Sequence, residues 1–273
     1  MREVTMDLDG VRMDVAAPVA TVTLARPDRR NALSLEMLAK VIEAFEAVPR
    51  DVRVVILAAE GNVFSAGHDM GEMIDRPEAF YSELFGTSRD LMRTIHAIPQ
   101  PVIARVQGIA TAAGCQLVAS CDLAIAVDSA WFATPGVRIG LFCTTPMVPV
   151  SRAVGHKRAM QMLLTGDAVD AETAVAWGLI NAAVPADDLD SAVDDLVTKI
   201  IRSSGETIAI GKHAYYAQAE MTEDDAYDVT TPIMAANAAT GDAQEGMGAF
   251  LDKREAQWRG SADTAAAVTE GDG

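Results

Sequence analysis

The chain has 273 residues, half of them apolar and 22% charged, which is the balance of a folded globular protein and excludes a chain that is disordered throughout. Asp and Glu number 39 against 22 Lys and Arg, and the formal net charge of −17 disfavours binding to nucleic acid or to an anionic membrane surface. No apolar run approaches the roughly 20 residues that a membrane-spanning helix needs, so we expect no membrane insertion.

The first half of the chain alternates predicted strands with predicted helices. Residues 19–25 alternate branched apolar residues with threonine and stop at Arg26-Pro27, which predicts a strand and then a turn. Residues 35–48 carry apolar side chains at helical spacing behind Ser34, a candidate N-cap. Continuous apolar runs predict further strands, buried on both faces, at residues 52–59, 101–106 and 123–127. This alternation indicates an α/β fold with largely parallel pairing.

The second half is predicted to be mainly helical, with one short strand at residues 179–184. Apolar periodicity predicts helices at residues 153–164, 171–177, 189–202, 206–221, 224–237 and 243–258. Residues 261–273 are rich in Ala, Thr, Asp and Gly without periodicity, which predicts a frayed tail.

The cysteines and the N-terminus indicate the compartment. Cys115, Cys121 and Cys143 are too few, and too apolar in setting, for a disulfide framework or a zinc site, so we expect buried free thiols and no metal. The first ten residues are acidic and have neither a basic segment nor an apolar core typical of a secretory signal. We therefore expect a cytoplasmic location.

Two segments rich in small residues are candidates for a functional site. Residues 64–69, Phe-Ser-Ala-Gly-His-Asp, follow a predicted buried strand, and small residues there let the backbone approach a ligand. His68 is equally well interpreted as a surface histidine without a functional role. Residues 107–117 lead from a strand into an apolar helix, whose N-terminus would present unpaired N–H groups to an anion or oxyanion. The alternative is close strand–helix packing.

Four ordered stretches together resemble the crotonase superfamily, typified by enoyl-CoA hydratases and isomerases. They are ARPDRRNAL (residues 25–33), FSAGHD (64–69), IPQPVIARVQGIATAAGCQLVASCDLAIA (98–126) and LLTGDAVDAETAVAWGLINAAVP (163–185). The resemblance implies a spiral of parallel β-strands and helices over residues 1–202, a C-terminal helical region for trimerisation over 203–260, and a disordered tail over 261–273. It also implies a homotrimer or a dimer of trimers.

The resemblance further implies an acyl-CoA substrate whose enolate-like oxyanion is bound by two backbone N–H groups. By the match of motifs these donors fall at His68 and Ala113. Fixed dipoles in a dry site stabilise such charge without reorganising. Ala112 and Ala113 stand where glycines are usual in the family, which reduces the room beside the thioester.

The acid–base positions depart from the family pattern. Hydratases of the family use two glutamates, and the matching positions here are Gln116 and Gly136, neither of which exchanges protons at neutral pH. His68, Asp69 and Cys143 are the candidate replacements, although Cys143 is better interpreted as a small pocket-lining residue. We expect the double change Gln116→Glu with Gly136→Glu to raise hydration if the new side chains fit.

For CoA, the resemblance implies contacts along residues 66–71 and basic side chains at the phosphates. The residues matched to CoA contacts are Ala66, Gly67, Asp69, Met70, Gly71, Arg30, Phe250 and Lys253. Many relatives carry a lysine where this chain has Gly71, and Arg30 or Arg29 is the candidate compensation. Phe250 and Lys253 match a pair that reaches the CoA of the neighbouring subunit, whereas the plain alternative for Lys253 is a cation at a helix C-terminus.

Two classes of function follow from this pattern. The first is an enoyl-CoA hydratase/isomerase-like enzyme of fatty acid metabolism, a lyase or isomerase that has no bound cofactor and takes a CoA thioester as substrate. The second is a non-catalytic acyl-CoA-binding or scaffold protein. Gln116 and Gly136 favour the second, and the two predicted oxyanion segments favour the first.

Overall fold

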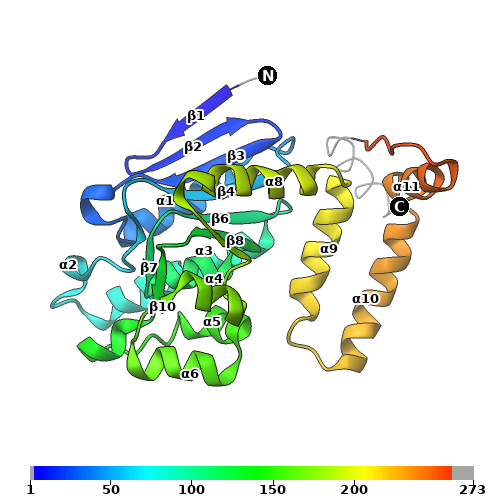
Figure 1. Cartoon of the computed structure of the whole chain (residues 1–273). Helices are drawn as coiled ribbons and strands as arrows, with labels where there is room; N and C mark the ends of the chain where they lie inside the picture. Colours follow the sequence, from blue (N-terminus) through cyan, green and yellow to red (C-terminus); the bar gives the residue numbers. More distant parts are fainter. Residues whose placement is uncertain (1–2, 260–273) are drawn as a thin grey trace.

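The apolar runs predicted as strands lie side by side in the larger of the two β-sheets formed by residues 3–259, the part of the chain that this computed structural model describes (Figure 1). The strand order is β1-β2-β3-β4-β6-β8-β11. The strands are β1 (Glu3–Asp7), β2 (Val11–Ala16), β3 (Val19–Leu24), β4 (Val54–Ala59), β6 (Val102–Val106), β8 (Leu123–Val127) and β11 (Ala182–Val184). Pairing is parallel from β3 to β11 and antiparallel in β1-β2-β3, so the α/β class with largely parallel pairing is confirmed.

A smaller four-stranded sheet, with the order β10-β9-β7-β5, was not predicted. Its strands are β5 (Val63–Ser65), β7 (Ile109–Thr111), β9 (Trp131–Ala133) and β10 (Val169–Asp170). Strands β5 and β7 pair in parallel. The segments that follow them therefore leave the sheet at the same edge, and these are the two segments rich in small residues.

Helices surround the sheets and continue into the C-terminal part of the chain. They are α1 (Leu35–Glu46), α2 (Met70–Met73), α3 (Glu78–Ala97), α4 (Ala113–Ser120), α5 (Met147–Val154), α6 (His156–Thr165), α7 (Ala171–Trp177), α8 (Leu189–Ile201), α9 (Gly205–Gln218), α10 (Glu223–Ala238) and α11 (Gly241–Asp252). Short 3-10 turns lie at Pro27–Arg29, Pro135–Ile139 and Ala186–Asp188. Helix α1 begins as predicted, because the Ser34 hydroxyl accepts the Met37 N–H at 3.1 Å.

Two helix predictions are corrected. The single helix expected at residues 153–164 is two helices, α5 and α6, because Gly155 adopts φ 78° and interrupts the hydrogen-bond ladder. The helix expected to reach residue 258 ends at Asp252, where Lys253 takes a left-handed conformation and closes the last turn. The tail predicted at residues 261–273 lies outside the described residues.

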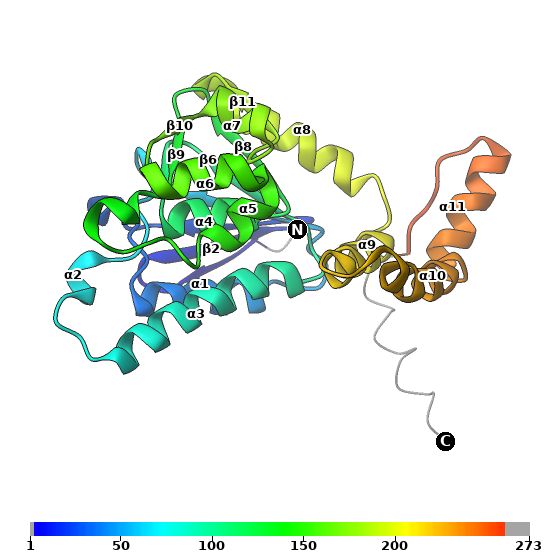
Figure 2. The ribbon, with the colours of Figure 1, turned by 90° about the horizontal axis from the view of Figure 1, so that it is seen from below.

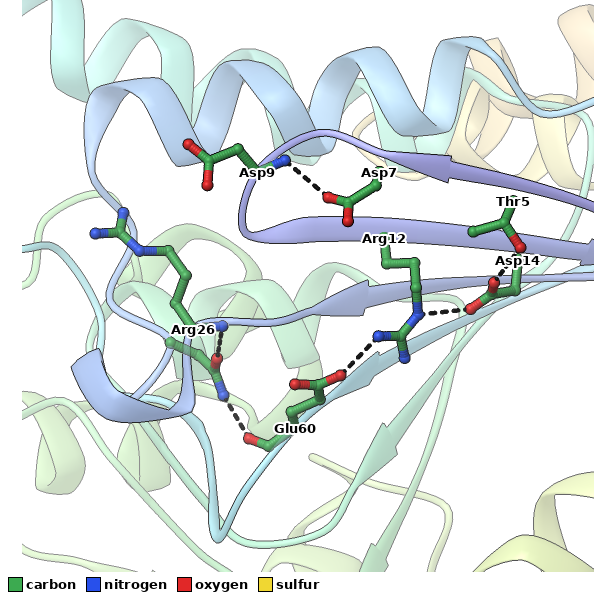
Figure 3. A network of polar contacts seen from close by, with 8 residues as sticks. Thr5, Asp7, Asp9, Arg12, Asp14, Arg26 and Glu60 are labelled. Carbon is green, nitrogen blue, oxygen red and sulfur yellow. Dashed lines mark hydrogen bonds and ion pairs between the residues drawn. The ribbon is translucent and has the colours of Figure 1, made fainter.

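The N-terminal hairpin β1–β2 is tied to the loop after β4 by a polar network (Figure 3). The Arg12 guanidinium donates to Asp14 at 2.8 Å and to Glu60 at 2.7 Å. The Thr5 hydroxyl donates to the same Asp14 carboxylate at 2.8 Å. Strands β1 and β2 are thereby fixed to the segment that leads into β5.

Helices α9, α10 and α11 project away from the sheets in both views (Figures 1 and 2). Neither α9 nor α10 buries a residue fully. The core lies instead between the sheets and α1, α3, α4 and α8, and its largest buried side chains include Phe45, Phe64 and Phe132. None of the helices in residues 3–259 combines the length and apolar character required to cross a bilayer.

Candidate active site

The segment at residues 64–69 is held in place by the turn at residues 30–33. The Ala66 N–H donates to the Arg30 carbonyl at 3.0 Å, and the Leu33 N–H donates to the Gly67 carbonyl at 2.8 Å. These hydrogen bonds use the carbonyl of Gly67, whereas the N–H of the next residue, His68, forms no hydrogen bond to the turn.

Asn31, which the sequence patterns above did not single out, is the centre of this support. It is fully buried in a left-handed conformation at φ 50°, and its side-chain amide donates to the carbonyls of Glu60 and Val63 at 2.9 and 2.8 Å. Its side-chain oxygen accepts the Arg26 N–H, beside Glu60 in Figure 3. Asparagine tolerates left-handed backbone better than most residues, and this was the signal available in the sequence.

The N-terminus of α4 packs directly against this segment. A Cβ on Gly67 would fall 3.2 Å from the Ala113 nitrogen, and a Cβ on Gly114 would fall 2.3 Å from the Ser65 carbonyl oxygen. Ala112 precedes the helix at φ 51° and ψ −118°, a conformation that is strained for a residue with a Cβ. The two predicted segments therefore meet, backbone against backbone.

Two backbone N–H groups are unused at this junction. Within residues 3–259 neither the His68 N–H nor the Ala113 N–H donates to a protein acceptor. The Ala113 group also lies at the positive end of the α4 dipole. Two such donors on neighbouring segments can bind an oxyanion.

The imidazole of His68 is buried behind the segment that carries its N–H. Its Nδ1 lies 3.2 Å from the Leu33 carbonyl, which can only accept, so Nδ1 carries the proton. Nε2 is buried and has no partner among the described residues, and the ring packs edge-on against Phe85 with the ring centroids 5.3 Å apart. Burial lowers the pKa of His68, so the ring is neutral at pH 7.

Gln116 lies one turn into α4, and its carboxamide is unsatisfied. The residue is 3% exposed, and Oε1 is buried without a partner in residues 3–259. The residue lines an open groove of about 1160 Å³ between α3, α4, α5 and α9. A bound ligand that reached the inner wall of this groove would meet the Gln116 amide.

Gly136 has no room for a side chain. A Cβ there would fall 2.0 Å from the Leu141 carbonyl oxygen and 2.9 Å from the Cys143 sulfur. A glutamate at position 136 therefore does not fit unless the backbone at Leu141 moves. The expectation that Gln116→Glu with Gly136→Glu raises hydration is therefore restricted to Gln116→Glu.

The three thiols are unpaired, and the sulfur of Cys143 takes the place of the missing side chain at Gly136. Cys143 is 6% exposed, and burial raises the pKa of its thiol, with partial relief from a backbone hydrogen bond to Gly136. Burial also raises the pKa of Cys115, to about 12, and that of Cys121. All three cysteines are therefore protonated thiols at neutral pH.

The remaining predicted CoA contacts fall into two groups. The Asp69 carboxylate caps the short helix α2 by accepting the Gly71 N–H at 3.0 Å, and Met70 is exposed beside it. The exposed Arg30 side chain has no partner within residues 3–259, whereas Arg29 lies 4.0 Å from Asp28. These residues line the same end of the molecule as residues 64–69.

Phe250 and Lys253 are not brought to this site within one chain. They lie at the end of α11, at the opposite side of the molecule from α2 in both views (Figures 1 and 2). Phe250 is 81% exposed.

The outer wall of the groove carries arginines that the sequence patterns did not indicate. Arg89 and Arg93 come from α3 and Arg152 from α5. Arg152 pairs with Glu220 at 2.5 Å and Arg89 with Asp90 at 2.8 Å, while Arg93 has no partner in the described part of the chain. The four-residue spacing of Arg89 and Arg93 on one helix face was the available signal. Residues 3–259 contain no group of three acidic, histidine or cysteine side chains able to hold a metal ion.

Comparison with known proteins finds similar sequences and structures among enoyl-CoA hydratases and isomerases. The family model described as Enoyl-CoA hydratase/isomerase matches residues 14–261. A Xenopus laevis protein, "Enoyl-CoA hydratase domain-containing protein 3, mitochondrial", is 43% identical over 243 residues, covering 88% of this chain and 83% of that protein. The crystal structure of a Mycobacterium smegmatis enoyl-CoA hydratase superposes with a TM-score of 0.89 at 45% identity, covering 91% of this chain and 98% of the other. Human enoyl Coenzyme A hydratase domain-containing protein 3 gives 0.86 at 40% identity, covering 94% and 99%.

The prediction of a cytoplasmic location is wrong. The relatives from Xenopus laevis, Mus musculus and Homo sapiens are all named mitochondrial. The acidic residues behind that prediction have a local structural role, because the Asp9 N–H donates to the Asp7 carboxylate at 3.0 Å in the turn of the β1–β2 hairpin (Figure 3). Acidic residues at these positions are explained by the turn that they stabilise, so they do not indicate in which cellular compartment the protein lies.

Proposed function

The chain belongs to the enoyl-CoA hydratase/isomerase family of the crotonase superfamily, and on this premise we propose that it binds acyl-CoA thioesters and stabilises their enolates. The observation that carries the proposal is the contact between Gly67 and the start of α4. It leaves the N–H groups of His68 and Ala113 without protein acceptors on adjoining segments. Negative charge that develops on a thioester oxygen there would be stabilised by fixed dipoles.

The CoA moiety is proposed to lie along residues 66–71. Met70 and Gly71 are exposed at this end of the molecule, and Arg30 supplies a cation that forms no ion pair within residues 3–259. Such a local cation is needed because the net charge of −17 opposes a polyanionic ligand. Phe250 and Lys253 would act on the CoA of a neighbouring subunit in a homotrimer or a dimer of trimers.

Ordinary hydration of an enoyl thioester is proposed to be poor. Water addition needs a base and an acid, and the positions that the family resemblance assigns to them hold a carboxamide at Gln116 and a filled space at Gly136. Each missing acid–base group lowers a rate by about 10² to 10⁴. The same observation favours the second candidate function, a non-catalytic acyl-CoA-binding protein.

The test combines binding with turnover. Calorimetry at low salt should show binding of crotonyl-CoA and butyryl-CoA, and the loss of the enoyl absorbance should give a kcat well below the ordinary value of about 10 per second. Gln116→Glu should raise crotonyl-CoA hydration at least about tenfold, because one acid–base group is restored. Gln161→Glu adds the same charge at an exposed site on α6 and should change nothing.

Absence of heat with every thioester would disprove the proposed binding. Hydration by the unchanged chain at about 10 per second or faster would disprove the interpretation of Gln116 and Gly136.

A further inference from the structure

The two segments that carry the proposed oxyanion donors continue from paired strands, but the pairing stops before it reaches the donors. Strands β5 and β7 pair in parallel, and their last paired residues are Ser65 and Ala110. The His68 N–H lies three residues beyond Ser65, and the Ala113 N–H lies three residues beyond Ala110. The strand pairing therefore does not by itself set the distance between the two N–H groups.

A side chain joins the two segments beyond the last paired residues. The Thr111 hydroxyl donates to the Ala66 carbonyl at 3.1 Å. Within residues 3–259, this is the only hydrogen bond between residues 66–68 and residues 111–113. Thr111 is the last residue of β7 and Ala66 directly follows β5, so the bond connects the segments two residues before each donor.

The peptide group that Thr111 contacts is held from two sides. Its carbonyl, that of Ala66, accepts the Thr111 hydroxyl, and its N–H, that of Gly67, donates to the Ser65 hydroxyl at 3.2 Å. The Ser65 hydroxyl in turn donates to the Asn31 carbonyl at 2.8 Å. Because a trans peptide group is planar, hydrogen bonds at its two opposite sides fix the orientation of the plane.

The next peptide group carries the first donor. The Leu33 N–H donates to the Gly67 carbonyl at 2.8 Å. The C=O and N–H of a trans peptide point in opposite directions, so the His68 N–H points away from Leu33. Its distance from the Ala113 N–H then depends on how far the segment moves relative to α4. Van der Waals packing at Gly67 opposes this movement weakly for each pair of atoms, whereas the Thr111 hydrogen bond opposes it directly.

The segment that carries the second donor also has to be held. Ala112 has φ 51° and ψ −118°, and such a conformation persists in a residue with a Cβ only where the surrounding contacts enforce it. The Ala112 N–H donates to the Ala133 carbonyl at 2.9 Å. The hydroxyl of the preceding residue, Thr111, is bonded to Ala66. The two bonds together anchor the start of α4 to the neighbouring strands.

We propose that Thr111 is a positioning residue for the oxyanion site, because its hydroxyl holds the His68 and Ala113 N–H groups at a spacing at which both can bind one oxygen atom. This inference rests on the proposed function and concerns the same site. Preorganised donors stabilise a developing charge because they do not have to move when it appears. The Thr111 hydroxyl should therefore matter more for a bound enolate than for a bound neutral thioester.

A β-keto thioester provides the test, because it forms an enolate without a catalytic base from the protein. The full chain is saturated with acetoacetyl-CoA, and the near-ultraviolet absorbance of the enolate is followed as the pH is raised. Hydrogen bonds to the charged form lower the apparent pKa of the bound thioester relative to its pKa in water. We expect such a lowering in the unchanged chain.

Variants at Thr111 separate the hydroxyl from the rest of the side chain. Thr111→Val removes the hydroxyl at nearly constant volume and should raise the apparent pKa of the bound thioester by about one unit or more, which is a tenfold loss of enolate at a given pH. Thr111→Ser keeps the hydroxyl and should restore the pKa found with the unchanged chain. Thr94→Val is the matched control, because it removes a hydroxyl that donates to a carbonyl at 3.0 Å within α3, and it should leave that pKa unchanged.

Calorimetry with butyryl-CoA, a thioester that does not ionise in this range, separates positioning from general damage. Each variant should bind butyryl-CoA nearly as tightly as the unchanged chain does. A merely structural role would weaken the binding of both forms of the ligand and leave the pKa of the bound thioester unmoved. Circular dichroism establishes folding, and Thr111→Ala repeats the test if Thr111→Val does not fold.

The outcomes distinguish this inference from the proposed function. An equal apparent pKa of bound acetoacetyl-CoA in Thr111→Val and in the unchanged chain would overturn the positioning role. A pKa in Thr111→Ser as high as in Thr111→Val would also overturn it. Either result leaves the proposed function standing. If no acyl-CoA binds, or if the unchanged chain does not lower the pKa of bound acetoacetyl-CoA, the proposed function itself is wrong.

Discussion

The backbone N–H and the imidazole of His68 lie in different environments. Within residues 3–259 its backbone N–H has no protein acceptor at the junction with α4, while its imidazole is turned into the protein, 9% exposed, against Leu33 and Phe85. A catalytic acid or base must lie within hydrogen-bond reach of the reacting atoms. The buried imidazole therefore has a structural role, because it holds the backbone of residues 67–69 in place. Protonation of the ring should change the free energy of unfolding more than the rate of a catalysed reaction.

We predict an acid-sensitive contribution to stability from His68 and His96. Burial lowers the pKa of both rings below the unfolded value of about 6.5. The unfolded chain therefore binds more protons as the pH falls below about 6.5, so the stability contribution is complete above that pH and is lost on acidification.

Urea denaturation at pH 7 and pH 5.5 measures this effect. His68→Gln retains a donor for the Leu33 carbonyl and should reduce the difference in unfolding free energy between the two pH values. His156→Gln, on the exposed start of α6, is the control and should not reduce it. An unchanged difference in His68→Gln would refute the assignment.

At the residue scale, the sequence could predict where backbone comes close but not how side chains turn. The small residues at 64–69 and 107–117 indicate close approach, and the structure brings Gly67 and Gly114 against the opposite segment. The inward turn of the His68 ring and the filled space at Gly136 depend on Phe85, Leu141 and Cys143, which are distant in sequence or on an irregular loop. No local pattern encodes such contacts.

Helix α9 contacts the core through side-chain bonds that include a buried ion pair between Lys212 and Asp122. Lys212 lies 2.7 Å from Asp122 and donates to the carbonyls of Ile95 and Gln100 at 2.7 and 2.8 Å. It thereby also satisfies a carbonyl in the last turn of α3, where a cation is favourable. Asp122 in turn accepts the hydroxyl of Tyr216 at 2.8 Å.

We predict that Lys212→Met lowers the free energy of unfolding by about 3 kcal/mol, because the buried Asp122 carboxylate loses its counter-charge. The two side chains are 6% and 15% exposed, so solvent does little to compensate. Pairing this change with Asp122→Asn should recover part of the loss, which a double-mutant cycle in urea measures. Strictly additive losses would show that the pair does not interact energetically.

Elements with long periodic patterns could be predicted, whereas short or edge elements could not. Helix α7 has the predicted bounds, and α1 and α8 differ from theirs only at the C-terminal end. The strands of the smaller sheet have two or three residues, too few to show a period. The β1–β2 hairpin carried a usable signal, the Asp9-Gly10 turn with both residues at positive φ, followed by alternating burial in β2.

Within residues 3–259, the C-terminal helices α9, α10 and α11 carry apolar residues that no other part of the chain covers. Tyr215, Tyr227 and Met234 are 63%, 64% and 69% exposed, and Phe250 and Leu251 more so. Exposed apolar groups concentrated on one part of a chain mark an interaction surface. The division into a core over residues 1–202 and a helical region over 203–260 stays a prediction, because Lys212 and Tyr216 join the two parts.

We predict that other copies of the chain cover this surface, in a trimer or a dimer of trimers. Light scattering at micromolar concentration should give three or six times the mass of the chain. Tyr227 and Met234 are seven residues apart on α10 and so share a face. The double change Tyr227→Glu with Met234→Glu should lower the measured mass, because charges placed in an apolar contact oppose its burial. Gln161→Glu should leave it unchanged, and a monomeric mass for the unaltered chain would contradict the prediction.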